Sequence, residues 1–231
     1  MPDSLTALDQ QLLLWFNGSD SLFLDHFVML LTNGLTWVPL YLALFYLVVK
    51  NNEKMSQIFL IISCALCCYL LSGGINDAII KPFVARWRPT EDPIFKYAVS
   101  VVAGYRGGSD YGFFSSHSAN TMAIAVFFSL LVRNRLLNTT LVLWAILNGW
   151  TRLYLGVHYP SDVLSGWLWG AMVGTLAYFA FYKFYYKISP KINYISSQYP
   201  KTGYSTIDID VVMLVLMTIL TVAVMASLSV F

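Results

Sequence analysis

Three short segments of the chain carry residues that could bind and transfer an anionic group. The first reads Lys81-Pro-Phe-Val-Ala-Arg86-Trp-Arg88-Pro89 and directly follows an apolar run. Arg88 offers a planar fork to two oxygen atoms and Lys81 offers a point charge, which is the chemistry of a phosphate clamp. Taken alone, these cations also fit ordinary anchors at a membrane boundary, with Trp87 in an aromatic belt. The first segment therefore predicts a phosphate clamp only in combination with the other two.

The second segment, Phe113-Phe-Ser-Ser-His-Ser-Ala-Asn120, opens another apolar run. Ser115 or Ser116 is a suitable N-cap residue, so the segment predicts the start of a helix. Backbone N–H groups at a helix start, together with the helix dipole, form a ready anion site. His117 would lie beside an anion bound there. The alternative interpretation is a histidine at the membrane interface whose hydrogen bonds are already made and which has no catalytic role.

The third segment runs from Thr151 to Asp162 and contains Arg152, Gly156, His158 and Pro160. Pro160 favours the first turn of a helix, which places Asp162 in that turn and His158 just before it. A carboxylate there accepts from one imidazole nitrogen and leaves the other as a nucleophile. For Arg152 and His158 to meet one ligand, the preceding helix must end near Gly156. The alternative is an ordinary helix-start charge beside an unrelated histidine.

Together, the three segments predict a single site for phosphoryl transfer. The cations hold the phosphate oxygens, one histidine attacks phosphorus in line, and the other donates a proton to the leaving oxygen. The predicted catalytic residues are His158 as nucleophile, His117 as acid and base, and Asp162 as its orienting carboxylate; the predicted phosphate-binding residues are Lys81, Arg88, Ser115, Ser116 and Arg152. We expect no cofactor and no metal, because no Asp, Glu, His and Cys cluster at ligand spacing is present in the sequence.

The spacing Lys81-x6-Arg88-Pro89, Ser115-x-His117 and Arg152-x5-His158-x3-Asp162 resembles the three-part signature of the type 2 phosphatidic-acid phosphatase family. The resemblance covers roughly residues 35–185 and is strongest to the bacterial six-helix lipid phosphatases. It implies a metal-independent phosphohistidine mechanism at the outer membrane face. Two departures stand out: the usual Pro-Ser-Gly-His reads Phe114-Ser115-Ser116-His117, and Thr151 replaces the usual Ser before the arginine.

Several functions share these residues. The resemblance implies hydrolysis of a lipid phosphate or pyrophosphate, with undecaprenyl pyrophosphate, phosphatidylglycerophosphate or phosphatidic acid, and lipid A as substrate candidates. The Phe-Phe-Ser-Ser-His-Ser variant is similar to that of lipid A 4′-phosphatases. A lipid phosphotransferase would use the same half-reaction, with a lipid hydroxyl in place of water. A transporter or lipid-phosphate binder would need the cations but not the nucleophile, and a vanadate haloperoxidase is disfavoured because its known members are soluble.

The elements that position these residues are predicted to be membrane helices. The chain has 231 residues, of which 58% are apolar and only 11% charged, about half the usual charged fraction. Six apolar stretches approach the roughly 20 residues that cross a bilayer, at 27–49, 55–76, 114–132, 136–157, 163–182 and 211–231. We therefore predict a single all-α integral membrane domain of six transmembrane helices over residues 1–231. Asn33-Gly34 and Pro39 predict a broken helix in the first crossing.

The ends of the chain lie outside the predicted family core. Residues 1–20 contain a short helix, at 4–16, that suits the membrane interface, and their acidic residues exclude a signal peptide. Residues 186–231 are predicted to form a cytoplasmic linker followed by the sixth transmembrane helix.

The distribution of basic residues predicts the orientation. Eight of the 14 Lys and Arg residues fall in the connections near 50–54, 133–135 and 183–208, which positive-inside reasoning assigns to the cytoplasm. The three chemical segments then face outward, the periplasm if the host membrane is a bacterial inner membrane. A net charge of +2 is too small to indicate nucleic-acid binding, so no nucleic-acid partner is expected. The bilayer and a lipid phosphate are the expected partners, and no obligatory protein partner is evident.

Overall fold

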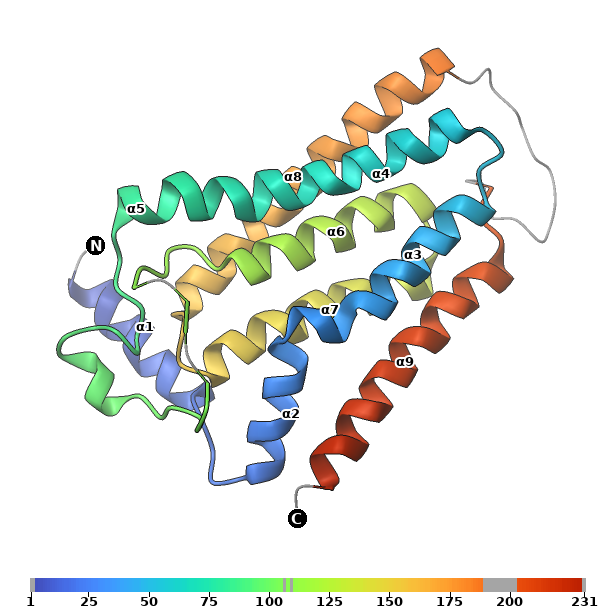
Figure 1. Ribbon diagram of the computed structural model, residues 1–231. Helices are drawn as coiled ribbons and strands as arrows, with labels where there is room; N and C mark the ends of the chain where they lie inside the picture. Colours follow the sequence, from blue (N-terminus) through green and yellow to red (C-terminus); the bar gives the residue numbers. More distant parts are fainter. Residues whose placement is uncertain (1–2, 106, 109, 189–202, 230–231) are drawn as a thin grey trace.

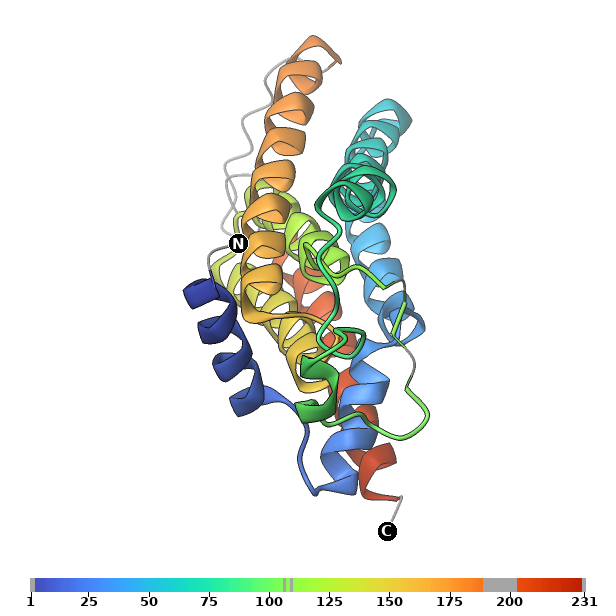
Figure 2. The ribbon, with the colours of Figure 1, turned by 90° about the vertical axis from the view of Figure 1, so that its left-hand side faces the viewer.

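The protein is a bundle of helices, and the long connection between residues 84 and 116 covers one end of it (Figures 1 and 2). The computed structural model describes residues 3–105, 107–108, 110–188 and 203–229. No β-strand occurs in these ranges, where one isolated bridge pairs Trp87 with Tyr111. The helices are α1 (Asp3–Phe16), α2 (Leu22–Thr32), α3 (Val38–Lys50), α4 (Met55–Tyr69), α5 (Lys81–Val84), α6 (Ser116–Val132), α7 (Arg135–Tyr154), α8 (Pro160–Ile188) and α9 (Thr206–Leu228). Short 3-10 turns, Gly34–Trp37 and Phe95–Ala98, and π-helical turns, Leu70–Gly74 and Asn76–Ile80, join them.

Several helix boundaries follow from local sequence signals, as predicted. Asn33 ends α2 and caps the next turn with its side chain, so the first crossing is broken there. Ser115 is the N-cap of α6, accepting from the Ser118 amide at 3.3 Å. Gly156 has a φ of +66°, which glycine adopts without strain, and it follows the end of α7. Pro160 opens α8.

The number of membrane crossings agrees with the sequence only in part. Three continuous helical segments among the described residues are long and apolar enough to span a bilayer: Met55–Val84, Pro160–Tyr185 and Thr206–Leu228. The bent pair Leu22–Thr32 and Gly34–Lys50, with 67° between its parts, makes a fourth if it acts as one span. The integral membrane class and the all-helical fold are confirmed. Six spans and an interfacial position for α1 stay predictions, because α6 has only 17 residues and α7 contains two arginines.

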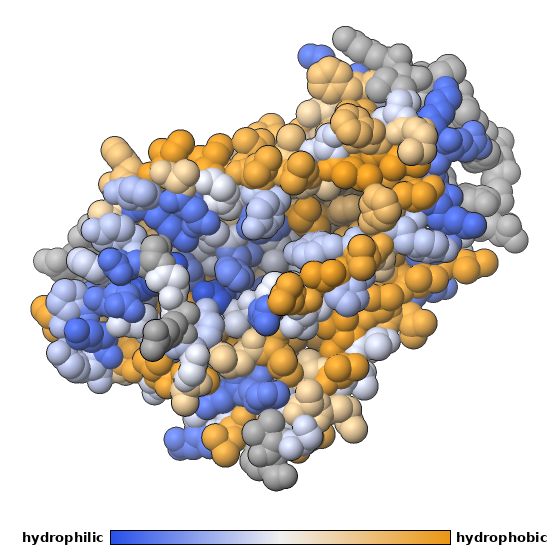
Figure 3. Space-filling model, in the orientation of Figure 1, coloured by the Kyte–Doolittle hydropathy of each residue, from blue (hydrophilic) through white to orange (hydrophobic). Residues whose placement is uncertain are grey.

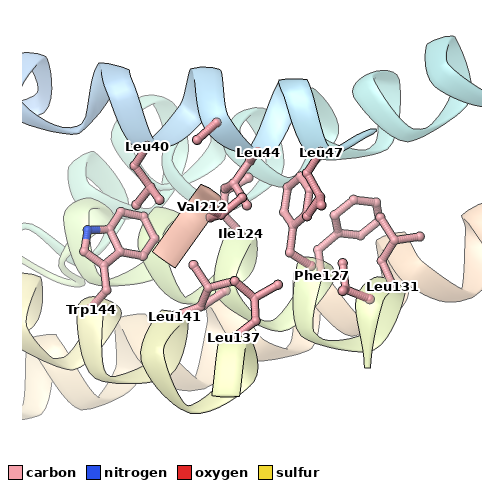
Figure 4. Close-up of a cluster of buried hydrophobic side chains, with 14 of the residues drawn as sticks. Leu40, Leu44, Leu47, Ile124, Phe127, Leu131, Leu137, Leu141, Trp144 and Val212 are labelled. Carbon is pink, nitrogen blue, oxygen red and sulfur yellow. The ribbon is translucent and has the colours of Figure 1, made fainter. Parts of the chain in front are cut away.

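The core of the bundle lies where α3, α6, α7 and α9 meet (Figure 4). Leucine, isoleucine and aromatic side chains from these helices interdigitate there, including Leu44, Phe127, Leu141, Trp144 and Val212. Trp37 packs edge-on against Trp144 with 5.6 Å between ring centroids. This core fixes the relative positions of α3, α6, α7 and α9 and leaves polar groups to the loop end of the bundle.

The contact between α6 and α8 is unusually close because glycines line it. Gly166, Gly170 and Gly174 recur every fourth residue on α8, and an added Cβ at each would meet the backbone of α6. At Gly170 the Cβ would lie 3.0 Å from both the Cα and the carbonyl carbon of Ala119. Small residues at this spacing let two membrane helices approach closely. The contact brings the start of α6 beside the start of α8.

The surface divides into two kinds of region (Figure 3). Hydrophobic side chains cover the upper and right-hand part of the bundle in that view, over α4 and α3. Hydrophilic side chains gather at the left-hand end, where α1 and the loops after α5 lie. The predicted cytoplasmic linker falls mostly at 189–202, outside the described residues.

Candidate active site

The three segments singled out in the sequence come together at one end of the bundle (Figure 1). The end of α5, the start of α6, the end of α7 and the start of α8 all lie there. Lys81, Arg88, Ser115, Ser116, Arg152, His158 and Asp162 are buried, and His117 is exposed. Burying the charged groups among these residues costs free energy unless each has a partner. The contacts of each side chain therefore show which charges are already compensated and which could bind an anion.

Lys81 is held at the end of a helix that passes through two π-helical turns. Its Nζ donates to Asp77 Oδ1 at 2.6 Å, one turn earlier. Ser116 Oγ donates to the same carboxylate oxygen at 2.7 Å and accepts from Asn76 Nδ2 at 2.8 Å. π-helical turns are frequent at functional sites because they redirect side chains. Here they place Asn76 and Asp77 so that the helix leading to the first segment holds Ser116 of the second.

Arg86 and Arg88 are oriented by a short extended segment. The amide of Arg88 donates to the Asp110 carbonyl at 2.9 Å, and the amide of Gly112 donates to the Arg86 carbonyl at 2.8 Å. Alternate residues of an extended chain point to the same side. Both arginine side chains therefore turn inward, while Trp87 packs outside against Tyr111 with 5.3 Å between ring centroids.

The start of α6 presents its first turn to the same region. The amide of Ser115 donates to the carbonyl of Asp162 at 3.0 Å, which ties α6 to α8. The hydroxyls of Ser115 and Ser116 are engaged in the helix cap and with Asp77, respectively. Because the Ser115 amide is also engaged, an anion at this helix start would be bound by the next amides, those of Ser116 and His117, which have no partner within a helix. His117 follows in this first turn and is exposed.

Arg152 enters from the last turn of α7 and is only 3% exposed. It donates to the Thr32 hydroxyl on α2, and its guanidinium lies 5.7 Å from the centre of the Tyr105 ring. Its Nε is buried with no hydrogen-bond partner among the described residues. Arg152 is thus a cation fixed in position whose Nε–H can still donate a hydrogen bond, as expected for a residue that binds an anion.

His158 lies at the centre of these cations and is 1% exposed. Its Nε2 is 3.2 Å from Arg88 Nη1, and its Nδ1 is 3.7 Å from Asp162 Oδ2. Because a guanidinium can only donate, Nε2 is the acceptor and Nδ1 carries the proton of the neutral ring. The distance from Nδ1 to Asp162 is too long for a hydrogen bond. Asp162 therefore lies close to His158, as predicted, but does not hydrogen-bond to it.

The charges around His158 keep its ring neutral. Burial is the main cause that holds the pKa of His158 well below its ordinary value, and the positive charges of Arg88, Arg152 and Lys81 lower it further. A neutral imidazole surrounded by cations suits a nucleophile that approaches an anionic phosphorus centre.

Asp162 is joined to a residue that the sequence did not suggest. Its Oδ1 accepts from Arg86 Nη1 at 2.7 Å, and its Oδ2 accepts from the Tyr159 amide at 2.9 Å. Arg86 Nη2 also donates to Asp9 Oδ2 of α1 at 2.5 Å. In the sequence, Arg86 is one cation of a basic segment, and no motif includes Asp9.

The site therefore has one neutral nucleophile candidate, one exposed histidine and three cations for phosphate oxygens. Among the described residues, no group of three His, Cys, Asp or Glu side chains lies close enough to hold a metal ion. Chemistry without a metal stays a prediction.

Comparison with known proteins places this arrangement in a family. The sequence matches the family described as the PAP2 superfamily over residues 61–186, which include all the predicted site residues. The chain belongs to the PAP2 superfamily. This PAP2 chain is 40% identical to the lipid A 4′-phosphatase of Bacteroides thetaiotaomicron over 185 residues, which cover 79% of this chain and 81% of that protein.

Two further PAP2 proteins extend the comparison. The lipid A 4′-phosphatase of Porphyromonas gingivalis is 34% identical over 75% of this chain and 73% of its own length. The crystal structure of a phosphatidylglycerolphosphate phosphatase from Bacillus subtilis shares the fold, with a TM-score of 0.58 and 20% identity over 82% of this chain and 90% of that one. The predicted family and the predicted lipid phosphatase activity are confirmed: this PAP2 protein is a phosphate-ester hydrolase.

Proposed function

We propose that this PAP2 enzyme removes the 4′-phosphate of lipid A through a phosphohistidine on His158. The observation that carries phosphoryl transfer is the meeting of Arg88, Arg152 and Lys81 around a neutral, buried His158. The observation that favours lipid A is the 40% identity to a lipid A 4′-phosphatase over four-fifths of both chains.

The proposed reaction has two steps. Arg88 moves its donors from His158 Nε2 to the phosphate oxygens, which frees Nε2 to attack phosphorus as the ester P–O bond breaks. His117 gives its proton to the leaving sugar oxygen. Water, deprotonated by His117, then attacks phosphorus, the P–N bond breaks, and inorganic phosphate leaves. Arg152, Lys81 and the helix-start amides of Ser116 and His117 stabilise the charge on the oxygens in both steps.

A cavity beside the site supports a substrate with hydrocarbon tails. It has a volume of about 320 Å³ and lies among α3, α4 and α6. Asn120, one turn after His117, lines the cavity near the site, and Phe128 lines it about 12 Å further along α6. The lining is otherwise almost entirely apolar, with Tyr41, Phe45, Ile62, Leu66 and Ile124 among its members. We infer that an acyl chain occupies this cavity while the phosphate meets His158.

The proposed orientation places the site at the periplasmic face of a bacterial inner membrane. The connections that carry the excess of basic residues, at 50–54 and 133–135, lie at the end of the bundle opposite the site, which supports this assignment (Figure 1). The whole chain then forms one domain with six crossings, in which α6 and α7 span the membrane inside a ring of more apolar helices. α1 exposes Leu5, Leu8 and Trp15, which suits a helix lying in the interface.

The test is phosphate release by the purified full-length protein in detergent micelles. Doubly phosphorylated lipid A, undecaprenyl pyrophosphate and phosphatidylglycerophosphate are compared at equal concentration, and mass spectrometry locates the phosphate that lipid A loses. We expect 4′-dephosphorylated lipid A as the main product. His158→Ala and His117→Ala should each lose about 100-fold or more in kcat. Preference for another lipid would refute the substrate, and an active His158→Ala enzyme would refute the mechanism.

A further inference from the structure

Arg86 forms a bridge between the N-terminal helix and the carboxylate nearest to His158. Its guanidinium donates to Asp162 at 2.7 Å and to Asp9 at 2.5 Å. The Arg86 Cζ also lies 4.2 Å from the centre of the Tyr159 ring. Asp9, although it belongs to α1, is 6% exposed, and Asp162 is fully buried. The three charged groups therefore form one buried chain that runs from α1 to the edge of the site.

Ser161 completes the connection to Asp9. Its amide donates to Asp9 Oδ1 at 3.0 Å, and its hydroxyl donates to Asp9 Oδ2 at 2.5 Å. Arg86 Nη1 donates to the same hydroxyl at 2.7 Å. Asp9 thus accepts hydrogen bonds from two elements, and its position is fixed by the start of α8. A carboxylate that served only to attach α1 to the surface would not need to face the guanidinium that holds Asp162.

The charge balance of this chain bears on the proposed reaction. Arg86 alone would cancel the negative charge of Asp162. Asp9 contributes a second negative charge, so the three groups together carry one net negative charge close to His158. When Nε2 bonds to phosphorus, the ring keeps its Nδ1 proton and becomes positively charged. Asp162 Oδ2, 3.7 Å from Nδ1, is the nearby carboxylate oxygen that can stabilise this charge.

We propose that Asp9 and Arg86 are positioning residues of the phosphatase reaction. Arg86 holds Asp162 in place. Asp9 offsets the positive charge of Arg86, so the negative charge of Asp162 remains available to stabilise the positively charged ring of phosphorylated His158. The inference rests on the proposed phosphohistidine mechanism. It assigns α1, which lies outside the matched family region of residues 61–186, an indirect part in the chemistry, through Arg86 and Asp162.

The test compares Asp9→Asn, Asp9→Glu and Arg86→Lys with the matched control Asp20→Asn. Asp20 belongs to the same N-terminal region, and its side chain is exposed. We expect Asp9→Asn to lower kcat by about 10- to 100-fold, the size typical for loss of a partner that orients a catalytic group, with KM changed less than about threefold. Rapid-quench measurement should show slower formation of the phosphoenzyme. Asp9→Glu should recover part of the rate, and Asp20→Asn should match the wild type.

Two further measurements separate positioning from simple attachment of α1. Asp9→Asn should melt lower than the Asp20→Asn control, because it loses a buried charged contact, so kcat is measured well below both melting temperatures, where it should still fall. In an Arg86→Lys background, Asp9→Asn should have a smaller effect than in the wild type, because Asp9 acts through Arg86. Wild-type kcat in Asp9→Asn, or a loss of kcat that follows the loss of melting temperature and is not restored by Asp9→Glu, would overturn the inference. An inactive wild type or an active His158→Ala would instead refute the proposed function.

Discussion

The close packing of α6 on α8 should make activity sensitive to a methyl group added at Gly170, about two helical turns after Asp162 on α8. In Gly170→Ala the new Cβ would lie 3.0 Å from two backbone atoms of Ala119, closer than such atoms ordinarily approach. The backbone of α6 cannot rotate away like a flexible side chain, so the two helices must separate. Overpacking of this kind costs about 1–3 kcal/mol. A displacement of about 1 Å between α6 and α8 is expected to reduce kcat about 100-fold, because α6 carries His117 and α8 carries Asp162.

The matched control is Gly74→Ala, whose added Cβ has no heavy atom within 4 Å. Phosphate release and melting temperature are measured for both variants in the same detergent. Gly170→Ala should lose activity and melt lower, and Gly74→Ala should do neither. Gly166→Ala, nearer the site, should lose more activity than Gly174→Ala for a similar loss of stability. Equal activity in Gly170→Ala and Gly74→Ala would show that the close helix contact does not position the site.

Three other expectations follow from the geometry. Arg88→Lys should lower kcat/KM by about 10-fold or more, because lysine cannot contact two oxygens as a planar fork; wild-type kinetics would refute this role. The burial-lowered pKa of His158 means that the unfolded state binds a proton below about pH 6.5 that the folded state does not. Stability should therefore fall as pH drops from 7 to 5, and a thermal melt series of His158→Gln should show a weaker fall. EDTA should leave phosphate release unchanged, and restoration by added metal would contradict the proposed chemistry.

Much of the local structure could be predicted from short signals. Asn33, Ser115, Gly156 and Pro160 each marked a helix boundary that the structure contains. These signals work because capping and backbone conformation depend on a few neighbouring residues. The glycine spacing of α8 is also visible in the sequence, at positions 166, 170 and 174. Read as a small-residue stripe, it would have predicted a tightly packed partner for that helix, although not which one.

The partners of the site cations could not be predicted in the same way. Arg86 and Arg88 flank Trp87, and an extended conformation would have placed both side chains on one face. Nothing local indicates that conformation, since it depends on pairing with residues 110–112. The role of Asp9 could not be predicted either, because its contact with Arg86 joins positions that are 77 residues apart in the sequence. The π-helical turns that present Asp77 to Lys81 also arise from packing, not from a recognised motif.

The distribution of these partners explains how a membrane protein tolerates so many buried cations. Lys81 is compensated by Asp77, Arg86 by Asp9 and Asp162, whereas Arg152 is met by the neutral Thr32 hydroxyl and the Tyr105 ring. Burying a cation that has no carboxylate partner is unfavourable, and the charge of an anionic ligand offsets that penalty. Arg152 is therefore the residue whose burial depends most on substrate. Together with Arg88, which lies 3.2 Å from the His158 ring nitrogen, it makes the site electropositive, so a bound phosphate would also offset the charge buried there.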